Sequence, residues 1–255
     1  ERIGRGLLRA EDVKPGVLSK RSGHAAREYV VAATKAALAG EISAMVTLPM
    51  NKEATQLTDP LFTGHTELIG ELCGVSDVTI MLASDQLIVT HVSTHCSLAQ
   101  AIERAKYDRI CTILRMTSDA VCRLKPRARI AVAGLNPHAG ENGLFGQEEI
   151  QEIRPAVEWA QGQGMPVEGP FPPDTVFYLA VRRKRFDAIV CMYHDQGHIP
   201  LKLLDFEAGV NVALGLPIVR TSVDHGTAFD IAGQDIASTT SLLRAVEFAL
   251  RLIKT

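Results

Sequence analysis

The sequence predicts an α/β protein in which strands and helices alternate along the chain, and two observations carry this prediction. Short apolar runs such as residues 44–48 and 188–192 end at a proline or a polar residue, as buried strands do. Between such runs lie segments with apolar residues at helical spacing, such as residues 25–38 and 242–253. Alternation of this kind is typical of an α/β sandwich whose functional side chains occupy loops at strand ends.

The remaining elements follow from local signals. Two β-rich runs, residues 78–83 and 87–92, flank the polar link Ser84-Asp85-Gln86 and predict a hairpin. Ser97 with Gln100 three residues later matches a capping box, and apolar positions up to Leu114 continue one predicted helix. Further predicted strands are residues 130–135 and 210–214, and further helices are residues 148–159 and a helix that begins at 176–181.

Composition narrows the class of protein. The 255 residues are 46% hydrophobic and 22% charged, with a formal net charge of −2, which fits a globular protein with a sizeable core. The basic residues are dispersed, so we expect no nucleic-acid partner. No apolar run reaches the roughly 18 residues that span a bilayer, and the first residues lack a signal-peptide pattern. We therefore expect a cytoplasmic protein without a membrane partner.

Five cysteines are scattered, odd in number and free of any C-x-x-C pair, so we expect them to be reduced. Three histidines are the more informative residues: His95, His138 and His194 each follow a predicted strand. Neutral imidazole is a good ligand for zinc and similar ions, and three such ligands leave positions for water or substrate. The intervals of 43 and 56 residues are uninformative alone, so a hydrogen-bonded structural role remains the alternative for each.

Two further histidines lie four residues from a member of this set. His91 precedes His95, and His198 follows His194. The first pair lies in a β-like stretch, and the second contains a glycine and is followed by a proline. We therefore predict that neither pair lies on one face of a helix, and that His91 and His198 only support the site.

Other polar residues follow the predicted strands. Asp174 and Asp195 can orient a ligand histidine or exchange protons, although a simple loop cap explains each equally well. Lys202, Asn211 and Arg220 supply donors for a phosphate or a carboxylate, and surface salt bridges are their alternative.

The segment Gly64-His65-Thr66-Glu67 opens an apolar helical stretch. Because a helix N-terminus offers free N–H groups and a positive dipole end, His65 and Thr66 can hold an anion such as phosphate. Simple N-capping by Thr66 is the alternative. The sequence contains neither a G-x-G-x-x-G fingerprint in a βαβ context nor a phosphate-binding P-loop, so any NAD site is of another design.

Taken together, four ordered clusters resemble one family. They are Gly64-His65-Thr66-Glu67, the segment Gly134 to Glu141, Met192-Tyr193-His194-Asp195-Gln196-Gly197, and the segment Arg220 to Ala228. They are similar to the 4-hydroxythreonine-4-phosphate dehydrogenase (PdxA) family, from about residue 44 to the C-terminus. The segment from His225 to Gly233 is also similar to the NAD-adenosine loop of isopropylmalate dehydrogenases.

The resemblance implies a fold and a division into domains. The fold would be an isocitrate/isopropylmalate dehydrogenase-like three-layer α/β/α structure, with two subdomains and the active site in the cleft between them. Residues 1–58 and 229–255 would form the cofactor-side domain, and residues 59–228 the metal, substrate and dimerisation domain. Family members begin with a strand and a Gly-Asp-Pro-Ala-Gly-Ile-Gly-type segment that this sequence lacks, so we expect part of the cofactor-side domain to be missing.

The resemblance also implies roles for individual residues. In a homodimer with shared active sites, His95 and His138 of one chain would join His194 of the other around a divalent metal, with Zn²⁺ expected and Mg²⁺ or Co²⁺ as alternatives. The substrate would contact His65, Thr66, Lys202, Asn211 and Arg220, and Lys202 and Asp174 would be catalytic. NAD, or NADP, would bind at His225, Gly226, Thr227 and Asp230.

The expected activity is the NAD-dependent oxidation, with decarboxylation, of a 4-phosphorylated 3-hydroxy acid. Residues 47–54 and 197–202 are more similar to the branch acting on 4-phosphorylated threonate or erythronate than to the vitamin B6 branch. His65-Thr66 favours a phosphorylated substrate over the aromatic dihydrodiols that other relatives oxidise. Two alternatives stay open: a metal-dependent hydrolase of a phosphorylated sugar acid, and a non-catalytic protein that binds a phosphorylated ligand.

Overall fold

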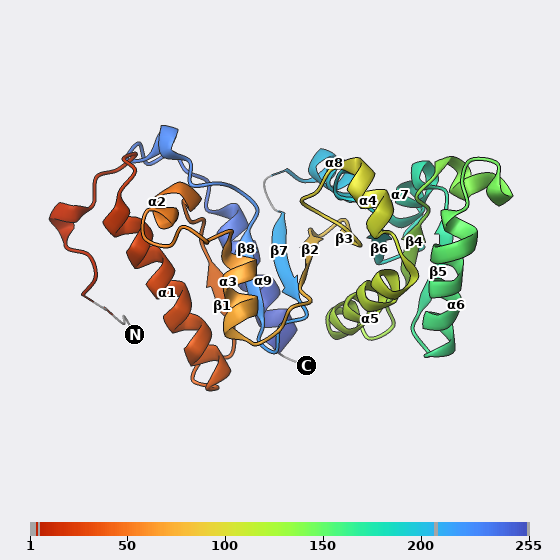
Figure 1. Ribbon diagram of the computed structural model, residues 1–255, viewed down its shortest axis with the longest axis horizontal. Coiled ribbons are helices and arrows are strands. Elements are labelled where there is room, and N and C mark those ends of the chain that lie inside the picture. Colours follow the sequence, from red (N-terminus) through yellow and green to blue (C-terminus); the bar gives the residue numbers. More distant parts are fainter. Residues whose placement is uncertain (1–3, 5, 207–208, 254–255) are drawn as a thin grey trace. The chain divides into compact units, whose positions relative to one another are not determined.

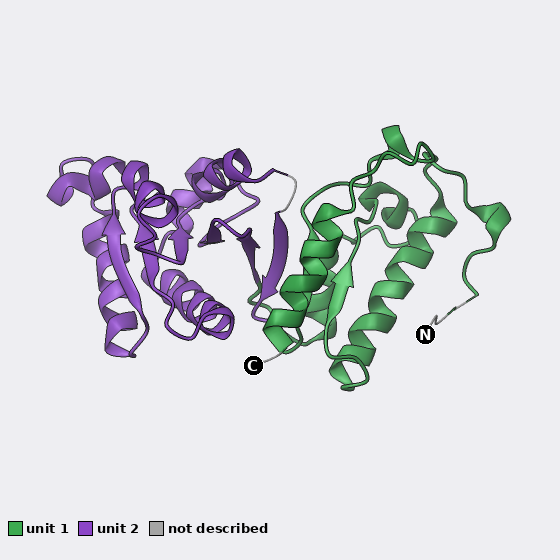
Figure 2. Cartoon of the chain, turned by 180° about the vertical axis from the view of Figure 1, so that it is seen from behind, with its two compact units in different colours: residues 1–78, 216–253 green, residues 79–215, 254–255 purple. Residues whose placement is uncertain are grey.

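The computed structural model describes residues 4, 6–206 and 209–253. Contacts divide the chain into two compact units (Figure 2). The terminal unit combines residues up to Val78 with Leu216–Ile253, and the central unit is Thr79–Gly215. Strands and helices alternate in both, which confirms the predicted α/β class.

The central unit is built on a mixed sheet. Its strand order is β7 (Val210–Leu214), β2 (Thr79–Ala83), β3 (Ile88–His91), β6 (Ala188–Cys191), β4 (Ile130–Ala133) and β5 (Val167–Phe171). The first three strands pair antiparallel, whereas β3, β6, β4 and β5 run parallel. All four residues of β4 and of β6 are buried, because helices cover a parallel sheet on both faces.

Helices of the central unit pack around these strands (Figure 1). They are α4 (Leu98–Arg104), α5 (Tyr107–Leu124), α6 (Arg154–Gly162), α7 (Pro173–Val181) and α8 (His194–Leu204), with the short turns η2 (Pro137–Gly143) and η3 (Glu149–Ile153). On α5, Ile110, Ile113 and Leu114 are fully buried at helical spacing. The core therefore fixes the ends of β3, β4 and β6, from which the candidate histidines emerge.

The terminal unit is smaller. Its strands β1 (Met45–Thr47) and β8 (Arg220–Val223) pair in parallel. Around them lie α1 (Lys20–Leu38), α2 (Lys52–Gln56), α3 (His65–Leu72), α9 (Thr240–Ile253) and the turns η1 (Ala10–Asp12) and η4 (Phe229–Ile231). Met45, Phe62 and Ile69 form a buried cluster with Val30 of α1, and α9 packs on β8 and β1.

Two local predictions, the hairpin and the capping box, are confirmed. The runs around Ser84-Asp85-Gln86 form the antiparallel pair β2 and β3. Ser97 and Gln100 make both hydrogen bonds of a capping box. All five cysteines lie in the described part of the chain, and each is a free thiol. Across the described residues, no helix is both long enough and apolar enough to traverse a bilayer.

Other expectations need correction. The helix predicted from Ser97 onward is two helices, because Ala105 and Lys106 leave helical geometry between α4 and α5. The prediction that His194 and His198 do not share a helix is wrong, since α8 contains both, with Pro200 inside it. Packing outweighs local propensity there. Gly197 is buried, and a Cβ on it would lie 2.5 Å from the Nε2 atom of His91.

The contact-defined units group some residues differently from the functional domains that the resemblance implies, and that functional division stays a prediction. Residues 59–78 and 216–228 belong to the terminal unit rather than to the unit that contains the candidate metal histidines. The contacts explain this grouping, because α3 packs against α1 and β8 pairs with β1.

Candidate active site

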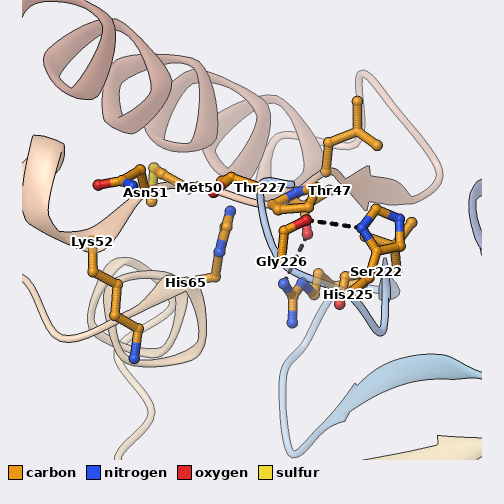
Figure 3. A pocket seen from close by; sticks show the side chains of 13 residues that line it. Thr47, Met50, Asn51, Lys52, His65, Ser222, His225, Gly226 and Thr227 are labelled. Carbon is orange, nitrogen blue, oxygen red and sulfur yellow. Dashed lines mark hydrogen bonds between the residues drawn. The ribbon is translucent and has the colours of Figure 1, made fainter. Parts of the chain in front are cut away.

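The terminal unit contains a polar cavity of about 320 Å³. Lys52 and His65 enter it from one side in Figure 3, and Thr47, His225 and Gly226 from the other. Its lining residues come from three segments that are far apart in the sequence: 47–52, His65 and 220–227. Two groups of sequence-predicted residues therefore meet here, His65 and Arg220 of the substrate set and His225, Gly226 and Thr227 of the cofactor set.

Arg220, the first residue of β8, supplies a buried positive charge to this cavity. It is only 4% exposed, and its Nη2 donates to Thr47 Oγ1 at 2.7 Å. The Nε atom is also buried and has no hydrogen-bond partner. Burial lowers the pKa of Arg220 to about 10, against the opposing effect of the Glu67 carboxylate. The guanidinium is thus charged at neutral pH and has donor capacity left for an anion.

His65 begins α3 beside this charge. The N-cap of α3 is Gly64, which offers no side-chain cap, and Thr66 is the second helical residue. The alternative of N-capping by Thr66 is therefore not what the chain adopts. Burial lowers the pKa of His65 to about 4, and the positive charges of Arg220 and Lys52 act in the same direction. At neutral pH a neutral imidazole thus lies at a helix N-terminus between two cations.

Lys52 also lines the cavity, a position that the sequence pattern does not predict. It is the first residue of α2, whose N-cap Asn51 accepts a hydrogen bond from the Ala54 N–H at 2.8 Å. The available signal was its position in a polar loop directly after the buried strand β1. The combination of Arg220, Lys52 and an uncapped helix N-terminus makes the cavity suited to a phosphate group.

The expected cofactor segment continues from this cavity. Ala228 adopts a left-handed conformation (φ 47°) immediately before η4, which contains Asp230. The Gln234 side chain donates to the Asp230 carbonyl oxygen at 2.7 Å and closes the turn. Asp230 itself is exposed and does not line the cavity.

In the central unit, four histidines gather where β3 and β6 end. The rings of His194 and His198 stack with centroids 3.6 Å apart, and the His95 ring lies 5.8 Å from that of His194. His91 is fully buried, with its Nε2 atom 3.2 Å from the Nδ1 atom of His198. Burial, together with the adjacent His198 and His194, lowers the pKa of His91 to about 3, so His91 is a neutral supporting ring.

The donor chemistry of this cluster fits a divalent metal. The Nδ1 atom of His194 lies 2.6 Å from Asp195 Oδ1. A carboxylate on one ring nitrogen is the usual partner of a metal-bound histidine, because it directs the other nitrogen, Nε2, toward the ion. His95 and His194 are both accessible to such an ion, since neither is buried.

His138 lies apart from that pair, in a strained loop. Its ring contacts Phe145 at a centroid distance of 6.1 Å. His138, Ala139, Glu141 and Asn142 all have positive φ values between 43° and 54°. Among the described residues, no three metal-binding side chains of one chain form a group. The structure therefore brings His95 and His194 together and leaves His138 outside their pair.

The other predicted site residues of the central unit are dispersed over three elements. Lys202 lies in the last turn of α8, with its Nζ atom 5.5 Å from the centre of the Phe206 ring. Asp174 is exposed in the first turn of α7, where it accepts a hydrogen bond from the Thr175 hydroxyl at 3.1 Å. Asn211 is the second residue of β7.

An α/β chain with a cationic cavity in one unit and an imidazole cluster in the other has the groups of an enzyme that acts on a small anionic substrate. Comparison with known proteins makes the class specific. The family model described as pyridoxal phosphate biosynthetic protein PdxA matches residues 5–249. The chain belongs to this family, and the relatives named below place it among dehydrogenases.

One relative is the D-threonate 4-phosphate dehydrogenase of Pectobacterium atrosepticum, which is 47% identical over 94% of this chain and 74% of its own length. The 4-hydroxythreonine-4-phosphate dehydrogenase of Beijerinckia indica is 48% identical over 93% of this chain and 70% of its own length. A crystal structure of 4-hydroxythreonine-4-phosphate dehydrogenase from Klebsiella pneumoniae superimposes with a TM-score of 0.86 at 45% identity, covering 95% of this chain and 74% of that one.

A solved structure with much lower sequence identity shares the fold. Isocitrate dehydrogenase from Methylococcus capsulatus matches with a TM-score of 0.53 at 14% identity, over 91% of this chain and 82% of its own. The isocitrate dehydrogenase-like fold expected from the sequence is thereby confirmed.

Proposed function

We propose that this dehydrogenase oxidises a 4-phosphorylated 3-hydroxy acid with NAD and decarboxylates the product, and that its substrate belongs to the D-threonate 4-phosphate class. One observation carries the proposal. The buried Arg220, with its unpartnered Nε, faces a cavity that is also lined by His65 and by the expected cofactor segment 225–227. Relatives named for D-threonate 4-phosphate and for 4-hydroxythreonine 4-phosphate support both the reaction and the substrate class.

The phosphate would bind in the terminal unit. Arg220 offers a charged donor, Lys52 a second charge, and α3 its uncapped N-terminus at His65 and Thr66. The neutral ring of His65 donates one N–H without adding a third charge to the pair of cations. These donors contact phosphate oxygens that do not react, so their contribution is to hold the substrate in place for the chemistry.

The metal would bind in the central unit through His95, His138 and His194, with Zn²⁺ expected and Mg²⁺ or Co²⁺ as alternatives. When bound, such an ion supplies Lewis acidity toward the substrate hydroxyl and carboxylate. Asp195 would keep the His194 ring in the orientation that directs Nε2 outward.

When bound, NAD, or NADP, would supply the acceptor for a hydride from C3 of the substrate, and the hydroxyl proton would have to be removed in the same oxidation. Loss of CO2 then leaves an electron pair on C2, which takes up a proton. We assign these proton transfers to Asp174 and Lys202, which have the carboxylate and the ammonium that the two steps need. Lys202 and Asn211 would also contact the substrate.

We further propose that two copies of the chain share their active sites. Among the described residues of one chain, no three metal-binding side chains form a group, so a second copy would complete the set of ligands. In the arrangement we favour, His95 and His138 of one subunit act with His194 of the partner subunit.

The test combines metal content with NADH formation. Purified protein with a divalent ion and D-threonate 4-phosphate is expected to form NADH, and chelation should abolish the signal. His138→Ala should lose bound metal and turnover together, whereas His24→Ala, an exposed histidine of α1, should lose neither. Unchanged metal content in His138→Ala would refute the ligand assignment. An absence of NADH with every 4-phosphorylated hydroxy acid would favour a hydrolase or a binding protein.

A further inference from the structure

The candidate metal histidines leave three neighbouring strands of the central sheet at the same edge. β3, β6 and β4 are adjacent and parallel. His95 follows the end of β3, His194 follows β6, and His138 follows β4. Because carboxyl ends of parallel strands meet at one edge, the geometry of these three chain segments determines where the imidazoles can lie.

Gln196 connects two of these segments directly. Its side-chain oxygen accepts a hydrogen bond from the Met192 N–H at 2.7 Å, just after β6. Its side-chain nitrogen donates to the Gly134 carbonyl oxygen, also at 2.7 Å, just after β4. Gln196 is 7% exposed, so both bonds are shielded from water. One amide therefore links the turn before His194 to the turn before His138.

The segment after β3 joins the same network through the carbonyl group of Met192. The Ser93 hydroxyl donates to the Met192 carbonyl oxygen at 3.0 Å. Ser93 lies two residues before His95. The chain at Met192 is thereby held by a donor from the β3 side and by the Gln196 acceptor.

Beyond Gly134, a buried carboxylate secures the His138 loop. Glu149, 1% exposed, accepts hydrogen bonds from the N–H groups of Leu135 and Asn136 at 2.7 and 2.8 Å. The left-handed residues that follow, His138 among them, cost free energy unless their surroundings hold them. Hydrogen bonds at the base of the loop hold this strained conformation in place, and the bond from Gln196 to the Gly134 carbonyl is one of them.

We propose that Gln196 is a positioning residue for two of the metal ligands that its chain supplies: it fixes the turn that carries His138, a ligand of one shared site, and the turn that carries His194, a ligand of the other. The proposal rests on the metal-dependent function proposed above. Glutamine supplies an acceptor for Met192 and a donor for Gly134, whereas an ionised glutamate lacks the donor, and methionine has no donor and only a weak acceptor.

The experiment compares Gln196→Met and Gln196→Glu with the wild type by Zn²⁺ competition against a chromogenic chelator. Both variants should bind Zn²⁺ about 10-fold to 100-fold more weakly, as loss of outer-shell partners generally does. The kcat of the Zn²⁺-saturated variants should fall further than KM rises, because the phosphate cavity in the terminal unit is untouched. Gln196→Glu keeps the acceptor for Met192, so it tests the Gly134 bond alone if Gln196→Met does not fold.

Gln161→Met is the matched control. Gln161 also donates to a backbone carbonyl, that of Val167, at 2.9 Å, and lies in the same unit away from the histidines. Its loss should leave Zn²⁺ affinity unchanged. Wild-type Zn²⁺ affinity in Gln196→Met, or in Gln196→Glu even at a pH of about 9, where the carboxyl is ionised, would overturn the proposal. An equal loss in Gln161→Met with matching losses of thermal stability would overturn it too. Failure of the wild type itself to bind any divalent metal would instead overturn the proposed function, and the role of Gln196 with it.

Discussion

At the scale of one residue, Arg220 illustrates how a group placed to bind an anion can lower the stability of the folded protein. A guanidinium that is only 4% exposed loses most of its hydration, and its Nε atom finds no protein partner. A buried charge with unused donors costs free energy that a bound anion would recover. In the described part of the chain, its Nη2 atom is oriented by the hydrogen bond that it donates to Thr47 Oγ1.

Thr47→Val is therefore expected to weaken phosphate recognition without disturbing the chemical step. Hydrogen bonds to charged groups contribute about 1.5–3 kcal/mol, so KM for the phosphorylated substrate should rise about tenfold or more. The kcat should change little, because Thr47 would contact neither the metal nor the reacting carbons. Thr47→Ser keeps the hydroxyl and should restore the wild-type KM; a fall in kcat at constant KM would contradict this role.

His65 gives a prediction in pH. Its pKa is lowered to about 4 in the folded chain, so between pH 4 and 6.5 the unfolded chain binds more protons than the folded one. The stabilisation that depends on a neutral His65 is fully present above pH 6.5. As the pH falls toward 4, the free energy of unfolding decreases by up to about 3 kcal/mol from this residue. Urea unfolding at pH 7 and pH 5 should show a smaller loss of stability in His65→Gln than in the wild type. Equal losses in both proteins would contradict the lowered pKa.

At the scale of elements, the position of α2 depends on the absence of one side chain. Gly23 of α1 lies so close to α2 that a Cβ there would be 2.2 Å from the Ala54 carbonyl oxygen. That obstacle is backbone and cannot rotate away. α2 carries Lys52 into the phosphate cavity, so the contact between these helices determines the place of one cation.

Gly23→Ala should consequently destabilise the protein by about 1–3 kcal/mol, the usual cost of overpacking. It should also raise KM for the phosphorylated substrate, because α2 must move away from α1. Gly162→Ala is the control: nothing lies within 4 Å of a Cβ at this helical position, so stability should be unchanged or slightly higher. Equal midpoints of urea unfolding for the two variants would contradict the packing argument.

The elements that the sequence pattern missed share a physical cause. β5 contains Gly169 and Pro170, which disfavour strands, but it lies at the end of the sheet order, where proline is tolerated. β8 begins with Arg220 and looks polar, yet all its residues are buried, and tertiary partners such as Thr47 accept hydrogen bonds from its side chains. α8 forms despite Gly197 and Pro200. The local sequence pattern predicted the elements with clear periodicity. It failed where contacts with residues distant in the sequence determine the secondary structure.

At the scale of the whole molecule, the candidate site was predictable as a set of residues and not as an arrangement. Resemblance grouped His65, Arg220 and segment 225–227 around a phosphorylated substrate and its cofactor, and the shared cavity supports that grouping. For Lys52, its position in a polar loop was the available signal. The sequence pattern did not predict that His95 and His194 of one chain lie together, nor the amide bridge of Gln196. These depend on distances between segments that are brought together only by folding.

Sharing of active sites between two subunits can be tested by complementation. His138→Ala and His194→Ala should each be inactive alone. In a mixed dimer, the intact His95 and His138 of one subunit meet the intact His194 of the other at one of the two sites. Random mixing should therefore restore about a quarter of the wild-type activity. No recovery in a mixture shown by affinity tags to contain mixed dimers would place all three ligands in one subunit.

The central claim is that the cationic cavity and the histidine cluster serve one oxidative decarboxylation. Its most direct test is to incubate the metal-loaded protein and NAD with D-threonate 4-phosphate or with unphosphorylated D-threonate, and to follow NADH and CO2 together. The account predicts equal amounts of NADH and CO2 from the phosphorylated acid, and at least about a hundredfold lower kcat/KM for the unphosphorylated one, which loses several charged hydrogen bonds. Equal turnover of the two acids, or NADH without CO2, would contradict it.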